Sequence, residues 1–287
     1  MNQIETIDKI QKVIGIAKRA RKSIGFIPTM GALHQGHLSL VKQSLLYNDI
    51  TVVSIFINPT QFGPNEDYAQ YPRTIDKDLF LLSQLNHVDY VFTPKPDSFY
   101  MEDPLKSTRI HIPKTSTYYC GQSRPHFFDG VCSIVLRLFN CILPTNAYFG
   151  EKDFQQLFLI QKMVHDLFLP IKIIKCPIVR DENGLAMSSR NLYLRSSQKK
   201  EASYIYKMLK YGQELYQAGN TDVSDVKAKM HQFLEKNTAI KLEYIVFVDE
   251  SNLELVNVCT ETTRVLVAAK VENTRLIDNV SLRNELN

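Results

Sequence analysis

The chain has 287 residues, with 34 lysines and arginines against 30 aspartates and glutamates, which gives a formal net charge of +4. Hydrophobic residues make up 44% and charged residues 22%, an ordinary balance for a globular protein that excludes disordered, collagen-like and disulfide-scaffold chains. At roughly 150 residues per domain, this length predicts two domains. The longest basic cluster, at residues 18–22, is typical of the exposed end of a helix, so we expect no nucleic-acid partner.

The apolar runs, the N-terminal residues and the cysteines indicate the cellular compartment of the protein. The longest apolar runs, such as residues 52–57, are far shorter than the roughly 20 residues that span a bilayer, so we expect no membrane partner. The first residues lack the basic-then-apolar layout of a signal peptide, which predicts a cytoplasmic protein. The five cysteines are scattered without a CxxC pair, and we expect reduced, mostly buried thiols.

Strands and helices are predicted to alternate through the first part of the chain. The expected elements up to residue 92 are a helix over about 4–17, a strand at 24–27, a helix carrying Leu38, Val41 and Leu45, a strand at 51–57, a helix from an N-cap at Thr74 to Leu85, and a strand at 89–92. Loops and short strands are expected over 94–125, then a helix at 130–142, a strand at 147–149, a helix at 153–168 and a strand at 171–174. This alternation predicts an α/β domain with a doubly wound, Rossmann-like parallel sheet.

The pattern changes after about residue 178. Two helices are expected at 196–218 and 222–236, followed by strands at 242–248, 264–271 and 275–280. Helices and strands that segregate in this way are typical of an α+β unit. We therefore expect a Rossmann-like domain at 1–178 and a smaller α+β C-terminal domain, acting as a lid, at 179–287.

The segment from Pro28 to His37 joins the first strand of this alternation to the next helix. Open parallel sheets present loop amides and a helix N-terminus to ligands at such a place, and phosphate is the favoured ligand there. Gly31 and Gly36 have P-loop spacing, but His37 stands where a Walker A site requires lysine. His34 and His37, three residues apart, would project to one side of a helical turn. A metal pair is disfavoured because no third ligand lies close by in sequence, and two unrelated surface histidines remain an alternative.

A second segment, residues 184–191, brings two hydroxyls and a guanidinium together. Ser188, Ser189 and Arg190 suit the non-bridging oxygens of a polyphosphate, because arginine can bind two of them at once. The same residues could equally cap a helix. These three residues indicate a polyphosphate site specifically only when they are taken together with His34 and His37.

These motifs resemble those of a known family. Residues 34–37 (HQGH) resemble the HIGH signature and residues 187–190 (MSSR) the KMSKS loop of the HIGH-motif nucleotidylyltransferases and class I aminoacyl-tRNA synthetases. Residues 28–34, 56–62, 71–74, 149–156 and 184–191, extended by 274–279, resemble in order and spacing the pantothenate synthetase (pantoate–beta-alanine ligase) family. The resemblance implies ATP-dependent ligation of (R)-pantoate and beta-alanine to pantothenate through an enzyme-bound pantoyl adenylate. It also implies a homodimer. We expect Mg²⁺ to be carried on the ATP phosphates and not fixed by a cage of protein ligands, and we assign no residue to it.

The resemblance assigns roles to individual residues. The implied catalytic residues are His37 as general acid, His34, Lys152 and Arg190. The implied ATP-binding residues are Met30, Gly31, Ala32, Leu33, His34, Gln35, Gly36, His37, Gly150, Glu151, Lys152, Asp153, Val179, Met187, Ser188, Ser189 and Arg190. Gln61 and Gln156 would bind pantoate, with Gln61 also facing beta-alanine. Neutral amides suit this task because they bind a carboxylate while leaving it nucleophilic.

One departure and two alternatives stay open. The family usually has Gly-His where this chain has His126-Phe127, which leaves the geometry of that loop undefined. A related nucleotidylyltransferase that keeps its adenylylated product is one alternative. A non-catalytic nucleotide or RNA sensor on the same fold is the other.

Overall fold

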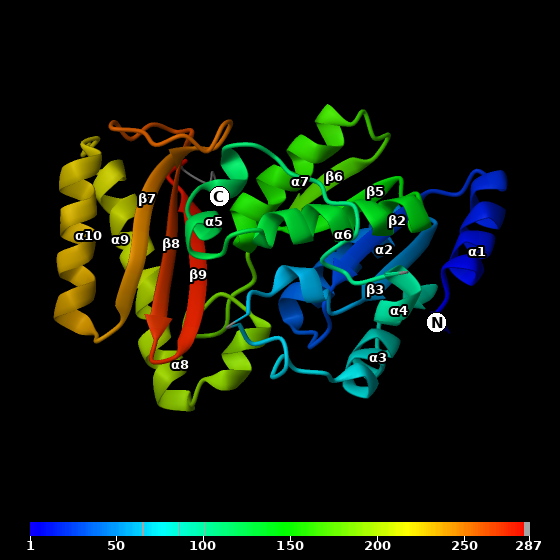
Figure 1. Cartoon of the computed structure of the whole chain (residues 1–287). Helices are drawn as coiled ribbons and strands as arrows, with labels where there is room; N and C mark the ends of the chain where they lie inside the picture. Colours follow the sequence, from blue (N-terminus) through cyan, green and yellow to red (C-terminus); the bar gives the residue numbers. More distant parts are fainter. Residues whose placement is uncertain (65, 86, 101, 284–287) are drawn as a thin grey trace. The chain divides into compact units, whose positions relative to one another are not determined.

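The structure is a computed structural model that describes residues 1–64, 66–85, 87–100 and 102–283 (Figure 1). The chain divides into two compact units. The first contains Met1–Glu151 and Gln155–Pro177, and the second contains Lys152–Phe154 and the described chain from Ile178 onwards.

Six parallel strands form the sheet of the first unit, in the order β1-β4-β3-β2-β5-β6. They are β1 (Asn2–Ile4), β2 (Ile24–Thr29), β3 (Ile50–Ile55), β4 (Tyr90–Phe92), β5 (Asn146–Gly150) and β6 (Lys172–Cys176). β2 and β3 pair along their whole length, from Ile24 opposite Ile50 to Thr29 opposite Ile55. The apolar, β-branched residues of β3 are buried almost throughout, as expected for a strand that is covered on both faces.

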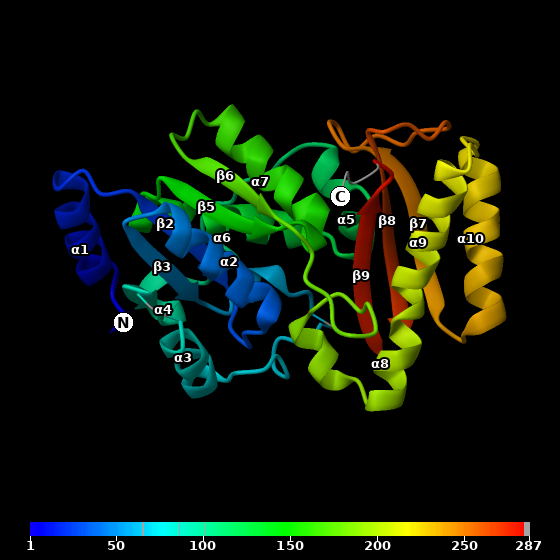
Figure 2. The same cartoon turned by 180° about the vertical axis from the view of Figure 1, so that it is seen from behind.

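Helices cover both faces of this sheet (Figures 1 and 2). They are α1 (Ile7–Arg19), α2 (Gln35–Tyr47), α3 (Ile75–Ser83), α6 (Phe127–Ile142) and α7 (Phe154–Asp166). Successive strand residues point to opposite faces, and β2 shows what lies on each. A Cβ at Gly25 would meet side chains of α2, whereas the ring of Phe26 packs edge-on against Phe139 of α6, with centroids 6.3 Å apart. The doubly wound α/β prediction is therefore confirmed.

Two local predictions for this unit were wrong, and a third was right about the position of the residue but not about its hydrogen bond. Residues 2–4, whose Ile4 was assigned to the first helix, form the edge strand β1, because they pair with β4. Within the described part of 94–125 there is no strand; the segment instead forms α4 (Pro96–Phe99), the 3-10 turn η2 (Thr115–Thr117) and α5 (Cys120–Ser123). Thr74 precedes α3 as expected, but its hydroxyl donates to the Asp78 carboxylate and does not cap the helix backbone.

The second unit is an antiparallel sheet with helices packed against it. Its elements are α8 (Ser196–Ala202), α9 (Tyr204–Gln217), α10 (Val223–Asn237), β7 (Lys241–Asp249), β8 (Thr263–Val271) and β9 (Thr274–Ser281), with the strands in the order β7-β8-β9. The single helix expected over 196–218 is two helices that meet at Ser203, whose hydroxyl bonds the Lys200 carbonyl. Val265 and Val267 of the central strand are buried in one core with Met208 of α9.

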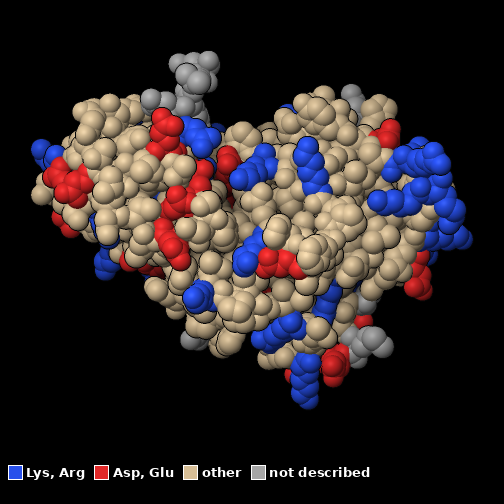
Figure 3. Space-filling model, turned by 90° about the horizontal axis from the view of Figure 1, so that it is seen from above, with Lys and Arg blue, Asp and Glu red and all other residues tan. Residues whose placement is uncertain are grey.

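The basic cluster at residues 18–22 and the five cysteines have the surroundings that the sequence predicts. α1 ends at Arg19 with Lys18 and Arg19 in its last turn. On the face shown in Figure 3, basic side chains are interspersed with acidic ones, and a group of basic residues lies at the end where Figure 1 places α1. All five cysteines are free and buried, as predicted. No helix in the described part of the chain has the length and apolarity to cross a membrane.

Candidate active site

The loop between β2 and α2 is held by a buried carboxylate from α3. Asp78 accepts hydrogen bonds from the backbone N–H groups of Ala32, at 2.9 Å, and Leu33, at 2.8 Å. Its side chain is only 1% exposed, and this burial raises the pKa of Asp78, although the two amides oppose the shift. Gly31 has a φ of +81°, and a Cβ there would lie 3.0 Å from the carboxylate. The sequence therefore needs glycine where the loop turns against Asp78.

The two histidines of the loop lie together at the start of α2. His34 occupies the N-cap position and His37 the first turn, with ring centroids 4.0 Å apart. The backbone N–H of His34 donates to Nδ1 of His37 at 3.4 Å. Because Nδ1 accepts, the proton of the neutral His37 ring is on Nε2, which can donate to a ligand. The pair and the helix N-terminus therefore form a potential anion-binding site.

A cavity of about 240 Å³ adjoins this loop. It is lined by residues that follow three neighbouring strands, among them Met30 after β2, Phe56 after β3 and Thr93 after β4. Asp78 and Gly31 line it as well. Ligands bind in open α/β sheets at the carboxyl ends of the strands, which is where this cavity lies.

Gln61 lies in a short buried segment next to α6. It ends the 3-10 turn η1 (Pro59–Gln61) and is 8% exposed. Its carbonyl accepts from Nη2 of Arg124 at 3.0 Å, and Arg124 also binds both oxygens of Glu66 at 2.6 Å each. Asn58, before the turn, is fully buried and donates to the Gly130 carbonyl of α6 at 3.1 Å. Hydrogen bonds therefore fix the backbone of Gln61.

The glutamines at the start of α7 have different surroundings. Gln155 is buried and donates to the Thr115 and Tyr118 carbonyls at 3.0 and 2.8 Å, which makes it a structural residue. Gln156, the residue expected to bind pantoate, is half-buried.

His126, at the departure from the family pattern, has a left-handed φ of +66° and precedes α6. Its Nδ1 lies 3.7 Å from the Asp129 carboxylate, and His111 contacts the same carboxylate at 3.0 Å.

In the second unit, the segment from Val179 to Asn191 is folded on itself. The Met187 N–H donates to the Val179 carbonyl at 2.9 Å, and Arg180 forms a β-bridge with Ala186. The Ser188 hydroxyl accepts from the Arg190 N–H at 3.3 Å, at the start of the 3-10 turn η4 (Ser189–Tyr193). Ser188 therefore does cap a helical turn, which was one reading of this motif.

Lys152 and Asp153 belong to the same unit, in the 3-10 turn η3 (Glu151–Asp153), with the ammonium 3.6 Å from the Asp153 carboxylate. The expected site residues thus form two groups, each placed within its own unit. Met30 to His37, Gln61, Gly150, Glu151 and Gln156 belong to the first unit, and Lys152, Asp153, Val179 and Met187 to Arg190 to the second. Among the residues that the structure describes, no three His, Cys, Asp or Glu side chains form a group that could hold a metal ion.

Sequence reasoning missed two residues that support these groups. Asp78 lies in the first turn of α3, and its spacing of four from the buried Leu82 was the available signal. Arg180 was not singled out, although its guanidinium pairs with the buried Asp278 carboxylate at 2.6 Å. No local sequence pattern predicts that ion pair, because 98 residues separate Arg180 from Asp278.

Comparisons with known proteins agree along the whole chain. The family model described as pantoate-beta-alanine ligase matches residues 2–281. The pantothenate synthetase of Pseudothermotoga lettingae is 47% identical, over 97% of this chain and 98% of that protein. The pantothenate synthetase of Caldicellulosiruptor bescii is 46% identical, over 96% and 97% of the two chains.

Solved structures show the same likeness. A pantothenate synthetase from Thermus thermophilus superposes with a TM-score of 0.92 at 36% identity, covering 99% of this chain and all of that one. The pantoate-beta-alanine ligase of Francisella tularensis, described as complexed with beta-gamma ATP and beta-alanine, has a TM-score of 0.80 at 35% identity, with 98% of each chain covered.

Proposed function

We propose that this chain, which belongs to the pantoate–beta-alanine ligase family, joins pantoate to beta-alanine with ATP through an enzyme-bound pantoyl adenylate. The observation that carries this proposal is the family match over residues 2–281, which spans every motif discussed above. The Francisella tularensis ligase, solved with beta-gamma ATP and beta-alanine, supports the choice of ATP and of the amine.

The first step would be displacement at the α-phosphorus of ATP. A pantoate carboxylate oxygen forms a bond to that phosphorus while the bond to the β-phosphate oxygen breaks, so pyrophosphate leaves. Such a displacement needs donors on the oxygens where negative charge grows and little covalent help from the protein. The N-terminus of α2 and the Nε2–H of His37 can supply these donors in the first unit. His37 would thus stabilise the leaving pyrophosphate, with His34 beside it.

Residues of the second unit would bind the rest of the nucleotide. The Lys152 ammonium and the group from Met187 to Arg190 would carry positive charge and hydrogen-bond donors to the phosphates. Gly150, Glu151, Asp153 and Val179 would contact the ribose and the base. Mg²⁺ would arrive on the ATP phosphates, where it neutralises charge, since such ions are usually bound through substrate phosphates and a few protein groups.

The acid would be bound by Gln61 and Gln156. Their amides can donate to the carboxylate and accept from the hydroxyls of pantoate without neutralising the nucleophile. In the second step the amine of beta-alanine attacks the acyl carbon of the adenylate, the acyl–oxygen bond breaks, and AMP leaves with pantothenate. The fixed backbone of Gln61 is consistent with a substrate-positioning role.

Positional isotope exchange tests the adenylate directly. ATP carrying oxygen-18 in the bridge between its α- and β-phosphates is incubated with pantoate and enzyme in the absence of amine. Reversible formation of the adenylate lets the bound pyrophosphate rotate, so we expect the label to appear in non-bridging β positions, and only when pantoate is present. Pantothenate formation from all three substrates without this exchange would argue for a single concerted step.

The same preparation distinguishes the alternatives. AMP release that depends on beta-alanine supports the ligase. Accumulation of an adenylylated acid that no amine discharges would indicate a nucleotidylyltransferase, and no pyrophosphate from ATP and pantoate would indicate a non-catalytic nucleotide sensor.

A further inference from the structure

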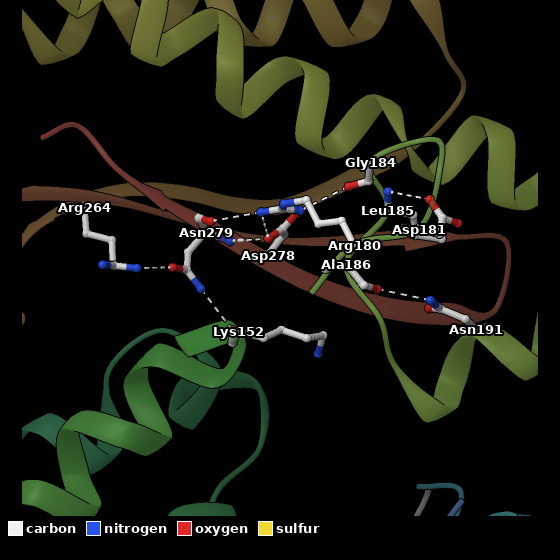
Figure 4. Close-up of polar contacts among 10 residues, drawn as sticks. All are labelled: Lys152, Arg180, Asp181, Gly184, Leu185, Ala186, Asn191, Arg264, Asp278 and Asn279. Atoms are coloured by element: carbon white, nitrogen blue, oxygen red, sulfur yellow. Dashed lines mark hydrogen bonds and ion pairs between the residues drawn. The ribbon is translucent and has the colours of Figure 1, made fainter. Parts of the chain in front are cut away.

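β9 carries two adjacent buried polar residues whose side chains bind different parts of the second unit (Figure 4). Asn279 is 2% exposed, and its Nδ2 donates to the backbone carbonyl of Lys152 at 3.0 Å. Its Oδ1 accepts from Nη1 of Arg264 at 2.6 Å. Both ends of this amide are therefore engaged, and one of them fixes the backbone of Lys152.

Asp278 makes the corresponding contact with the segment that carries Met187 to Arg190. Its two carboxylate oxygens bind Nη1 and Nη2 of Arg180 at 2.6 and 3.0 Å. The same guanidinium donates to the Gly184 carbonyl at 3.1 Å and lies 3.6 Å from the centre of the Tyr206 ring. A buried bidentate pair with an additional hydrogen bond and a ring contact has one well-defined geometry. Asp278 therefore anchors the turn at Gly184.

The two attachments are coupled through the strand. The Asn279 N–H donates to the Asp278 carboxylate at 2.8 Å, so the residues also bind each other. Paired with β8, which is buried almost throughout, β9 is a rigid support. In Figure 4 the backbone of Lys152 faces Asn279 while its side chain extends away, so this hydrogen bond does not engage the ammonium, which lies 3.6 Å from the Asp153 carboxylate. One pair of residues thus sets the positions of Lys152 and of the turn that leads to Arg190.

We propose that Asp278 and Asn279 are positioning residues of the ligation reaction, which hold Lys152 and the Met187–Arg190 segment in fixed register for the ATP phosphates. This inference rests on the proposed function, because it assigns those two groups to ATP. Neither residue touches the substrate in this scheme; each acts through a residue that does. A small displacement of a phosphate-binding group costs a large factor in rate, so such supports affect turnover more than folding.

The substitution Asn279→Asp isolates the link to Lys152. It keeps the shape of the side chain and the oxygen that accepts from Arg264, but it replaces the amide donor with a second oxygen facing the Lys152 carbonyl. We expect kcat/KM for ATP to fall by about 10- to 100-fold, with KM for beta-alanine changed little. Asn279→Ala, which adds no charge, is measured in parallel so that the result does not depend on one variant folding. Asn237→Asp is the matched control, because it removes an amide-to-carbonyl bond, to Phe233, at an exposed helix end.

A double-mutant cycle with Lys152→Ala separates positioning from fold maintenance. If Asn279 acts through Lys152, the Asn279→Asp loss shrinks to less than about threefold in the Lys152→Ala background, in kcat/KM and in the ATP dissociation constant measured by calorimetry. An equal loss in both backgrounds, or one matched by Asn237→Asp, overturns the proposal. Wild-type protein that forms no pantothenate would instead refute the proposed function, an outcome that the wild-type assay reports before any variant is made.

Discussion

At the scale of single residues, a buried carboxylate organises the loop on which both histidines depend. Asp78, which is 1% exposed, accepts hydrogen bonds from two backbone N–H groups, those of Ala32 and Leu33. An amide left unpaired in such a place costs its full desolvation energy. The geometry at the start of α2 is therefore determined in part by a residue on α3.

Replacing Asp78 with alanine should destabilise the protein by about 2–6 kcal/mol, since each of the two amides that lose the Asp78 acceptor costs roughly 1–3 kcal/mol. The measurement is the free energy of unfolding from urea denaturation. Asp76→Ala is the control, because Asp76 lies in the same first turn but is exposed, and its loss should cost no more than about 0.5–1 kcal/mol. Equal costs for the two substitutions would show that the Asp78 hydrogen bonds contribute nothing specific.

At the scale of elements, α6 and the turn η1 approach so closely that one position between them has room only for glycine. A Cβ at Gly130 would lie 2.3 Å from the Thr60 carbonyl oxygen and 2.7 Å from its carbon. These are backbone atoms, so no side chain can rotate to make room. Thr60 precedes Gln61, and any separation of the two elements would move that glutamine.

Gly130→Ala should therefore lower stability by about 1–3 kcal/mol despite the better helix propensity of alanine, and it should raise KM for pantoate. Gly15→Ala is a control for which we expect the opposite change in stability. Gly15 lies inside α1 with only the end of the Arg19 side chain near its missing Cβ, at 3.7 Å, so alanine there should stabilise by about 0.5–1 kcal/mol. Thermal and urea unfolding measure the stability of both variants, and steady-state kinetics measure their KM for pantoate. A stabilised Gly130→Ala variant with normal KM would contradict the packing argument.

Most elements could be predicted because their apolar spacing is strong, whereas β1 and the short helices α4 and α5 could not. Residues 2–4 form a strand only because β4 offers an edge, a fact that no local pattern contains. The break at Ser203 was missed because apolar periodicity continues on both sides of it. The site divides in the same way: His34, His37 and Ser188 to Arg190 stand in contiguous motifs, whereas Asp78 and Arg180 act through partners that are distant in sequence.

At the scale of the whole molecule, burial keeps four of the cysteine thiols protonated well into the alkaline range. Burial raises the pKa of Cys132 to about 12 and that of Cys141, Cys176 and Cys259 to about 11. The unfolded chain loses these protons near pH 9, whereas the folded chain retains them. Between these values the folded state binds more protons, so stability falls as the pH rises, by up to about 1.4 kcal/mol per pH unit for each thiol.

We therefore expect native protein at pH 8 to react with a thiol reagent no faster than it unfolds, because all five thiols are buried, burial keeps four of them protonated, and only the thiolate attacks. In denaturant we expect all five cysteines to react at once. Timed labelling followed by mass spectrometry counts the modified residues. Urea unfolding at pH 8 and pH 10 then measures the loss of stability. Cys132→Ala should show a shallower loss than the wild type, since it removes one of the four thiols whose pKa is raised in the folded chain. Labelling of a native thiol within minutes at pH 8, or equal slopes for the wild type and Cys132→Ala, would show that burial does not control these groups.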